Sequence, residues 1–143
     1  VETLCATTVV CTDKTGTLTP NEVTVKRIWV PGSCADVSGA GYEKEGRILA
    51  SSTAIARQVK ILLTIGIVCA EADIVDDEKH AELWKVIGDP TEAALLVAAA
   101  KDGQKVETVR GAFQRQQVIP FSSQRRMMTT VDINRSSPLF PPE

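Results

Sequence analysis

The chain has 143 residues, of which 43% are hydrophobic and 24% are charged. This length and apolar content suit one compact domain and exclude both a wholly disordered chain and a large multidomain assembly. Lys and Arg number 16 and Asp and Glu number 18, which gives a formal net charge of -2. Because no net positive field exists to gather polyanions, we expect no nucleic-acid partner.

Membrane insertion and disulfide formation are also disfavoured. The longest strongly apolar stretch without charge, residues 61–70, has about half of the roughly 20 residues that a membrane-spanning helix needs. The first residues lack the basic and apolar regions of a signal peptide, and the missing initiator Met suggests a fragment. The four cysteines form no CxxC pair, and most lie in apolar runs, which favours reduced thiols over disulfides or zinc.

Two strands are predicted near the N-terminus. Residues 7–11 (TTVVC) are β-branched and uncharged, which predicts a short buried strand that leads into the polar loop 12–20. Residues 22–30 begin with alternating hydrophobicity, which predicts a second strand, and the turn pair Pro31-Gly32 ends it. The Gly-rich segment 34–46 is interpreted as a loop with at most one short strand.

Two helices are predicted. In residues 51–73 apolar side chains recur at helical spacing, which indicates a helix buried on more than one face. The second helix follows Asp89 as N-cap, has Pro90 at its first position and Glu92 three residues after the cap, and ends before Gly103. The acidic run 73–82 lacks calcium-loop spacing, so it is interpreted as a solvated loop or turn.

The remaining strands complete the predicted fold. Residues 83–87 alternate as a strand, and residues 116–121 and 127–133 flank the polar tip 122–126 as an antiparallel hairpin. The Pro-rich residues 134–143 are expected to be a tail without a core role. The prediction is an α+β fold, in which the strands starting near residues 22, 83, 116 and 127 form one mostly antiparallel sheet packed by the two helices.

The polar loop after the first strand carries CTDKTGTLT at residues 11–19. A carboxylate just past the end of a buried strand lies at the rim of a sheet, where open α/β sheets hold ligands, so Asp13 could act as a nucleophile. Its neighbours would cradle a phosphoryl group with one positive charge, two hydroxyl donors and one flexible backbone position: Lys14, Thr15, Thr17 and Gly16. The alternative is an Asx or Ser/Thr turn, in which these side chains bond only to their own backbone.

Residues 13–19 (DKTGTLT) match the phosphorylation motif of P-type ATPases at every position. GAGYEKEG at 39–46, GDPTEAAL at 88–95 and PFSSQRRMM at 120–128 resemble the same family in the same order. The chain therefore resembles a piece of a type II, calcium-type or related cation pump. The resemblance implies that residues 1–20 begin a phosphorylation domain of haloacid-dehalogenase-like fold. Residues 21–133 would form a nucleotide-binding domain, incomplete at its C-terminus, and residues 134–143 a tail.

The resemblance implies a role for each residue of the DKTGTLT loop. Asp13 would take the γ-phosphoryl group of ATP with Lys14 beside it, Thr15 and Thr17 would contact phosphate, and Asp13 and Thr15 would contact Mg²⁺. Phosphatases of the same fold place a general-acid Asp at the position of Thr15. Because threonine cannot perform that proton transfer, a phosphoenzyme would persist, which makes a soluble phosphatase the weaker alternative.

The resemblance also implies an adenine pocket. Phe121 would stack on the base, and Met128 would line the pocket. Arg126 would lie near the phosphates. Glu92, with Thr91 as its neighbour, would accept a hydrogen bond from the adenine amino group. The residue types suit these roles, since aromatic stacking on a base is worth roughly 1–3 kcal/mol and a guanidinium complements phosphate. Without the resemblance, Phe121 and Met128 would be interpreted as hairpin core, Arg126 as a solvated turn and Glu92 as half of a capping box.

In the family, such a domain works on the cytosolic face of a membrane. The implied partners are ATP and the remaining phosphorylation, actuator and transmembrane domains of the parent pump. The family's Lys-Gly-Ala-Pro-Glu segment is not found in the sequence, so we expect the chain alone to bind ATP weakly and without turnover. A non-enzymatic nucleotide sensor or interaction module is the remaining alternative, and nothing in these residues specifies the transported ion.

Overall fold

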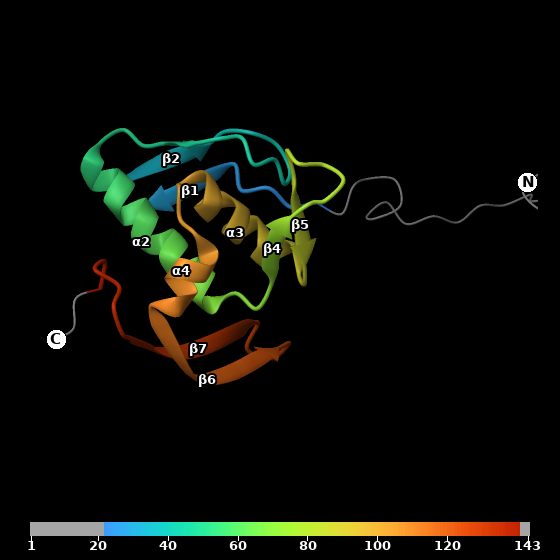
Figure 1. Cartoon of the computed structure of the whole chain (residues 1–143). Helices are drawn as coiled ribbons and strands as arrows, with labels where there is room; N and C mark the ends of the chain where they lie inside the picture. The colour runs from blue at the N-terminus through green and yellow to red at the C-terminus, as the bar shows by residue number, and fades with distance from the viewer. Residues whose placement is uncertain (1–21, 141–143) are drawn as a thin grey trace, which may run out of the picture.

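The computed structural model describes residues 22–140, and Figure 1 shows their arrangement. The predicted α+β class is confirmed, whereas the strand 7–11, the DKTGTLT loop and the rest of the phosphorylation-domain segment lie outside the described residues. In chain order the elements are β1 (Arg27–Val30), β2 (Ser33–Val37), β3 (Ile48–Leu49), α2 (Thr53–Cys69), β4 (Asp73–Asp76), β5 (Trp84–Ile87), α3 (Pro90–Lys101), α4 (Val106–Gly111), β6 (Phe113–Ser122) and β7 (Met127–Asn134).

The strands of residues 22–140 form three small antiparallel sheets, β1-β2-β3, β4-β5 and β6-β7. The prediction of one sheet is therefore wrong. Each predicted strand pairs instead with a close neighbour in the sequence, as β5 does with β4 and β6 with β7, because a short connection closes an antiparallel pair locally. The helices separate these pairs: α2 and α3 lie between the β1-β2 sheet and the β6-β7 hairpin (Figure 1).

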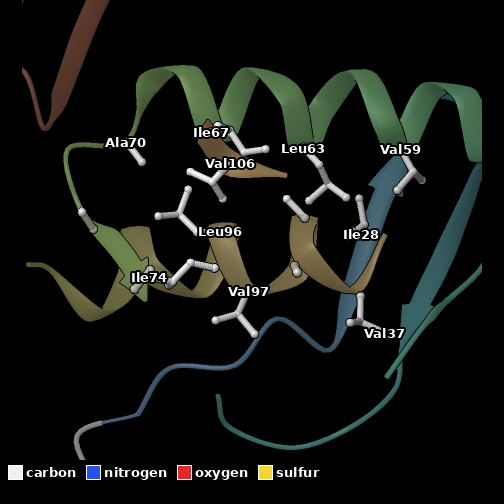
Figure 2. Close-up of a cluster of buried hydrophobic side chains, with 14 of the residues drawn as sticks. Ile28, Val37, Val59, Leu63, Ile67, Ala70, Ile74, Leu96, Val97 and Val106 are labelled. Atoms are coloured by element: carbon white, nitrogen blue, oxygen red, sulfur yellow. The ribbon is translucent and has the colours of Figure 1, made fainter. Parts of the chain in front are cut away.

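The core lies where α2 and α3 pack on each other. Val59 and Ile67 of α2 and Leu96 of α3 are fully buried, and Figure 2 shows these side chains directed into the space between the two helices. Helix α3 is rich in alanine and buried on most of its surface, which allows neighbouring elements to approach it closely. Side chains from the sheets and from α4 complete the cluster: Ile28, Val37, Ile74 and Val106.

A buried polar contact joins α2 to the loop that follows α3. The hydroxyl of Thr64 lies 2.8 Å from the carbonyl oxygen of Lys60 and 2.8 Å from Oε1 of Gln104. The side-chain amide of Gln104 donates to the same Lys60 carbonyl at 3.3 Å. Because both side chains are buried, the contact satisfies polar groups that would otherwise destabilise the interface.

Three expectations about the irregular segments change. Residues 73–76, interpreted as part of a solvated loop, form β4 because β5 supplies a complete antiparallel partner. Helix α4 was not predicted, since its six residues carry no side-chain N-cap. The last described residues are not an unpacked tail, because Ser137 is buried and Phe140 packs against Phe113.

None of the helices described in residues 22–140 is both long enough and apolar enough to cross a bilayer.

Candidate functional site

The β6-β7 hairpin presents Phe121 at a β-bulge. Ile119 pairs with Thr129 and Ser122 pairs with Met127, so Pro120 and Phe121 together face the single residue Met128. Proline has no N–H to give to the ladder, and a bulge accommodates that loss while it redirects the neighbouring side chain. The Phe121 side chain is 64% exposed, so the interpretation of Phe121 as hairpin core is wrong, and its ring is accessible next to Met128.

The two arginines of the hairpin tip behave differently. Arg125 is bound within the hairpin, since Nη2 donates to the Thr129 hydroxyl at 3.0 Å. Arg126 adopts a left-handed conformation with φ of 54°, and its backbone N–H donates to the Ser122 carbonyl at 2.7 Å. Within residues 22–140 its guanidinium has no hydrogen-bond or ion-pair partner, so Arg126 carries the guanidinium at the tip that is not already bonded to the hairpin.

Met128 is half-buried and lines a cavity of about 380 Å³ between α2 and the hairpin. The cavity wall is mixed, with apolar side chains of α2 and of the strands next to hydroxyl groups and a carboxylate. Its other lining residues are Thr64, Ile65, Val68, Cys69, Phe113, Thr129, Thr130, Asp132 and Phe140. Met128 therefore occupies a concave surface, as its predicted role in a pocket requires.

Glu92 lies in the first turn of α3, whose N-cap is confirmed. Asp89 accepts from the N–H groups of Thr91 at 2.8 Å and of Glu92 at 3.3 Å. The reciprocal half of the predicted capping box does not form, because Oε2 of Glu92 accepts from the N–H groups of Glu71 and Ala72, both at 2.9 Å. The segment between α2 and β4 leaves these donors without a ladder partner, so a nearby carboxylate satisfies them.

A residue that the sequence analysis missed lies opposite Glu92. Arg110 of α4 donates from Nη2 to the carbonyl oxygens of Ala70 at 3.1 Å and Ala72 at 2.6 Å. Residues 70–72, called here the α2–β4 junction, are thus bound on their carbonyl side by Arg110 and on their N–H side by Glu92. The only local signal for Arg110 is the pair Val106 and Val109 at helical spacing, which is too short to predict a helix.

The described site residues form two groups. Phe121, Arg126 and Met128 share the end of the β6-β7 hairpin, whereas Thr91 and Glu92 lie at the start of α3, and Figure 1 shows the hairpin below α2 and α4. No hydrogen bond or ion pair among residues 22–140 joins the two groups. The remaining predicted site residues, Asp13, Lys14, Thr15 and Thr17, lie outside the described part of the chain.

Residues 58–138, from the middle of α2 to the segment after β7, match the family of P-type ATPase cytoplasmic domain N. The chain belongs to this family. The membership predicted from the DKTGTLT, GDPTEAAL and PFSSQRRMM segments is confirmed, and the matched residues contain both groups of described site residues.

Relatives of this P-type ATPase domain align along nearly the whole chain. It is 37% identical over 139 residues to a calcium-transporting ATPase of Bacillus subtilis, covering 94% of this chain and 15% of that protein. It is 38% identical over 136 residues to the probable cation-transporting ATPase F of Mycobacterium tuberculosis, and the alignment covers 92% of this chain and 15% of that protein. With the calcium-transporting ATPase type 2C member 2 of Rattus norvegicus it shares 37% identity over 130 residues, and the alignment covers 90% of this chain and 13% of that protein. The chain thus spans about 15% of the length of the bacterial relatives.

Proposed function

We propose that this chain binds the adenine nucleotide of a P-type cation-transporting ATPase. The observation that carries the proposal is the accessible ring of Phe121, 64% exposed, at a bulge that faces Met128. An exposed aromatic side chain costs solvation free energy unless something covers it, and the flat face of a purine is a suitable cover. Phe121 stacks on adenine in this proposal, and Met128 lines the adjoining surface.

The other described residues would contact the rest of the nucleotide. At the hairpin tip the guanidinium of Arg126 has no partner among the described residues, which suits it for phosphate. Glu92 would accept from the adenine amino group, with Thr91 beside it, and its carboxylate is oriented by two backbone N–H groups. When ATP is bound, the two groups of residues would approach each other across the nucleotide, as domains and loops commonly do around a ligand.

In the parent pump, ATP held in this way would transfer its γ-phosphoryl group to Asp13, supported by Lys14, Thr15 and Thr17. Asp13 and Thr15 would also hold Mg²⁺, which would neutralise charge on the transferred group. The transfer would drive ion transport through the remaining phosphorylation, actuator and transmembrane domains, with this domain on the cytosolic face. Two of the relatives above are named for calcium transport, and we propose a cation as the transported species without a narrower assignment.

For the isolated chain we propose weak ATP binding without turnover. A nucleotide titration followed by ¹H–¹⁵N NMR tests the binding: amide signals near Phe121 and Glu92 should shift at millimolar ATP. Phe121→Ala should weaken binding by roughly 5- to 150-fold, since stacking on a base is worth about 1–3 kcal/mol. Trp29→Ala is the matched control, because Trp29 is also an exposed aromatic side chain, at 71%, but lies in a different sheet.

The titration has clear adverse outcomes. Amide signals of Phe121 that stay unmoved at millimolar ATP would overturn nucleotide binding, and equal losses in the Phe121 and Trp29 variants would overturn the stacking assignment. Turnover is tested with ATP labelled at its γ-phosphorus in the presence of Mg²⁺. Acid-stable label that appears on the wild type and is lost in Asp13→Asn would contradict the absence of phosphorylation.

The phosphate role of Arg126 has its own test. Because Arg126 has a positive φ of 54°, Arg126→Gly removes the guanidinium and at the same time suits the backbone conformation. This variant should bind ATP several-fold more weakly while its thermal stability is unchanged or higher. Arg125→Gly is not a matched control, because the Arg125 side chain bonds within the hairpin, so adenosine is used instead: its affinity should not change in Arg126→Gly.

A further inference from the structure

The peptide groups of the α2–β4 junction connect Arg110 to Glu92. Nη2 of Arg110 donates to the carbonyl oxygens of Ala70 and Ala72, at 3.1 and 2.6 Å, and Nε donates to that of Ile67 at 3.4 Å. Nη1 lies 3.5 Å from Oδ1 of Asp73, the first residue of β4. One guanidinium thus binds the end of α2, the junction and the start of β4.

The opposite side of the same junction binds Glu92. Its Oε2 accepts from the N–H groups of Glu71 and Ala72, both at 2.9 Å, so Ala72 gives its carbonyl oxygen to Arg110 and its N–H to Glu92. The space there is tight, because a methyl group added at Gly88, just before α3, would lie 3.0 Å from Cα of Ala72. The junction therefore has little room to rotate next to Gly88. Any rotation would move the two N–H donors and with them the carboxylate of Glu92.

The last carbonyl groups of a helix have no partner inside the helix, and a cationic side chain there is favourable. This effect explains why Arg110 binds Ile67 and Ala70 and would by itself be purely structural. The bond to Ala72 is different, because Ala72 lies beyond the helix and carries one of the two N–H groups that orient Glu92. Linked hydrogen bonds of this kind strengthen one another in a poorly solvated setting.

We infer that Arg110, through the α2–β4 junction, positions the carboxylate of Glu92 for the amino group of a bound purine. The inference rests on the adenine role proposed above for Glu92. A fixed carboxylate favours a 6-amino purine, which donates a hydrogen bond, and disfavours a 6-oxo purine, which places an oxygen at the same point. Arg110 is thus a positioning residue for base selectivity and touches no part of the nucleotide.

The test compares ATP with ITP, which carries a 6-oxo purine, by NMR titration of the chain and its variants. The wild type should bind ATP about tenfold more tightly than ITP, since a hydrogen bond to a charged group changes a dissociation constant by a factor of about ten to a hundred. Arg110→Met should bring the ratio of the two Kd values close to one and change the Kd for ITP less than twofold. Arg110→Lys should give an intermediate ratio, because one ammonium group cannot span the carbonyl groups that the guanidinium binds.

Arg115→Met is the matched control. Arg115 also donates to a carbonyl oxygen of α2, that of Val68, but it does not bind the junction. The ATP to ITP ratio of this variant should equal that of the wild type. A general loss of packing in any variant would weaken both nucleotides by the same factor and leave the ratio unchanged, so the ratio separates positioning from stability.

The outcomes distinguish the inference from the proposed function. A wild-type preference for ATP that is lost in Glu92→Gln but fully kept in Arg110→Met overturns the role of Arg110 and leaves the role of Glu92 intact. A wild type without any preference overturns the adenine role of Glu92 and the inference with it. Should Arg110→Met fail to fold, a ratio in Arg110→Lys equal to that of the wild type overturns the role of Arg110.

Discussion

The ring of Phe140 packs edge-on against that of Phe113, with centroids 5.9 Å apart and planes at 76°. Asn134 supports this contact, because its side chain accepts from the Ser137 N–H at 2.8 Å and donates to the Phe140 carbonyl oxygen. The segment after β7 thereby turns back onto the start of β6 and closes one wall of the cavity that Met128 lines.

Removal of this ring contact should destabilise the chain. Phe140→Ala should lower the free energy of unfolding by about 1–2 kcal/mol, since an edge-on aromatic pair is worth about 0.5–1.5 kcal/mol beyond the area that it buries. Urea denaturation measures the loss. A double-mutant cycle with Phe113→Leu isolates the pair, and a coupling free energy near zero would show that the two rings contribute independently.

The interface between α2 and α3 offers a matched pair of adjacent leucines. Leu96 is fully buried whereas Leu95 is 39% exposed. Leu96→Ala should cost about 2–5 kcal/mol, because it removes transfer free energy and leaves a cavity in the core, and Leu95→Ala should cost less than about 1 kcal/mol. Equal shifts of the urea midpoint in the two variants would contradict the burial that the structure assigns to them.

The N-cap of α3 should make stability depend on pH. The backbone N–H groups of Thr91 and then Glu92 lower the pKa of Asp89 below its ordinary value of 3.8. A carboxyl group whose pKa is lower in the folded state stabilises that state above its ordinary pKa, and the contribution is lost as the pH falls through the folded pKa. Asp89→Ala should therefore lower the free energy of unfolding by about 0.5–2 kcal/mol at neutral pH. The difference in stability between this variant and the wild type should become smaller in acid.

Asp89→Asn is the control for this titration, because asparagine is an equally good N-cap and does not ionise in this range. Thermal unfolding at neutral pH and near pH 2 gives the comparison. The stability gap between the Asn and Ala variants should stay constant between the two conditions. A gap between wild type and Asp89→Ala that also stays constant would rule out the ionised carboxylate as the source of the effect.

Lys101 should also make stability rise with pH, but at high pH and because its charged form destabilises the folded state. Its side chain is 8% exposed and lies against two glycines, since a methyl group at Gly39 would approach Nζ to 2.9 Å and one at Gly46 would approach Cδ to 2.9 Å. Burial lowers the pKa of Lys101 below its ordinary value of 10.5, partly offset by the charge of Glu43. No hydrogen-bond or ion-pair partner of its ammonium group is found in residues 22–140.

The folded state therefore releases the Lys101 proton at a lower pH than the unfolded state does. Between the lowered pKa and 10.5 the unfolded state binds more protons than the folded state, so Lys101 makes the free energy of unfolding rise with pH. Below the lowered pKa the ammonium group is charged in both states, and its full destabilising effect is present. Lys101→Met should raise the melting temperature near pH 7, and the gain should shrink near pH 10. Lys105→Met, at an exposed position, should show no such trend, and a pH-independent gain for Lys101→Met would exclude the titration.

Local sequence patterns predicted the elements that are stabilised by residues close to them in the sequence. Helix α3 was anticipated because Asp89, Pro90 and Gly103 each act through their own neighbouring backbone, and the structure shows the Asp89 cap and a positive φ at Gly103. The β6-β7 hairpin was anticipated because its strands are adjacent in the sequence and have a polar tip. Helix α4 was missed because six residues carry too little periodicity and no side-chain cap.

The sequence by itself determined the family, the α+β class, the start and end of α3 and the choice of most candidate site residues, because each depends on a contiguous motif or on hydrophobic period. Only the tertiary structure decided that the strands form three separate sheets, that Phe121 is exposed while Met128 lines a cavity, and that Glu92 and Arg110 bind opposite sides of residues 70–72. The last of these features depends on contacts between residues about 20 and 40 positions apart in the chain. Such contacts form only after α2, α3 and α4 have packed, and no local pattern in the sequence specifies them.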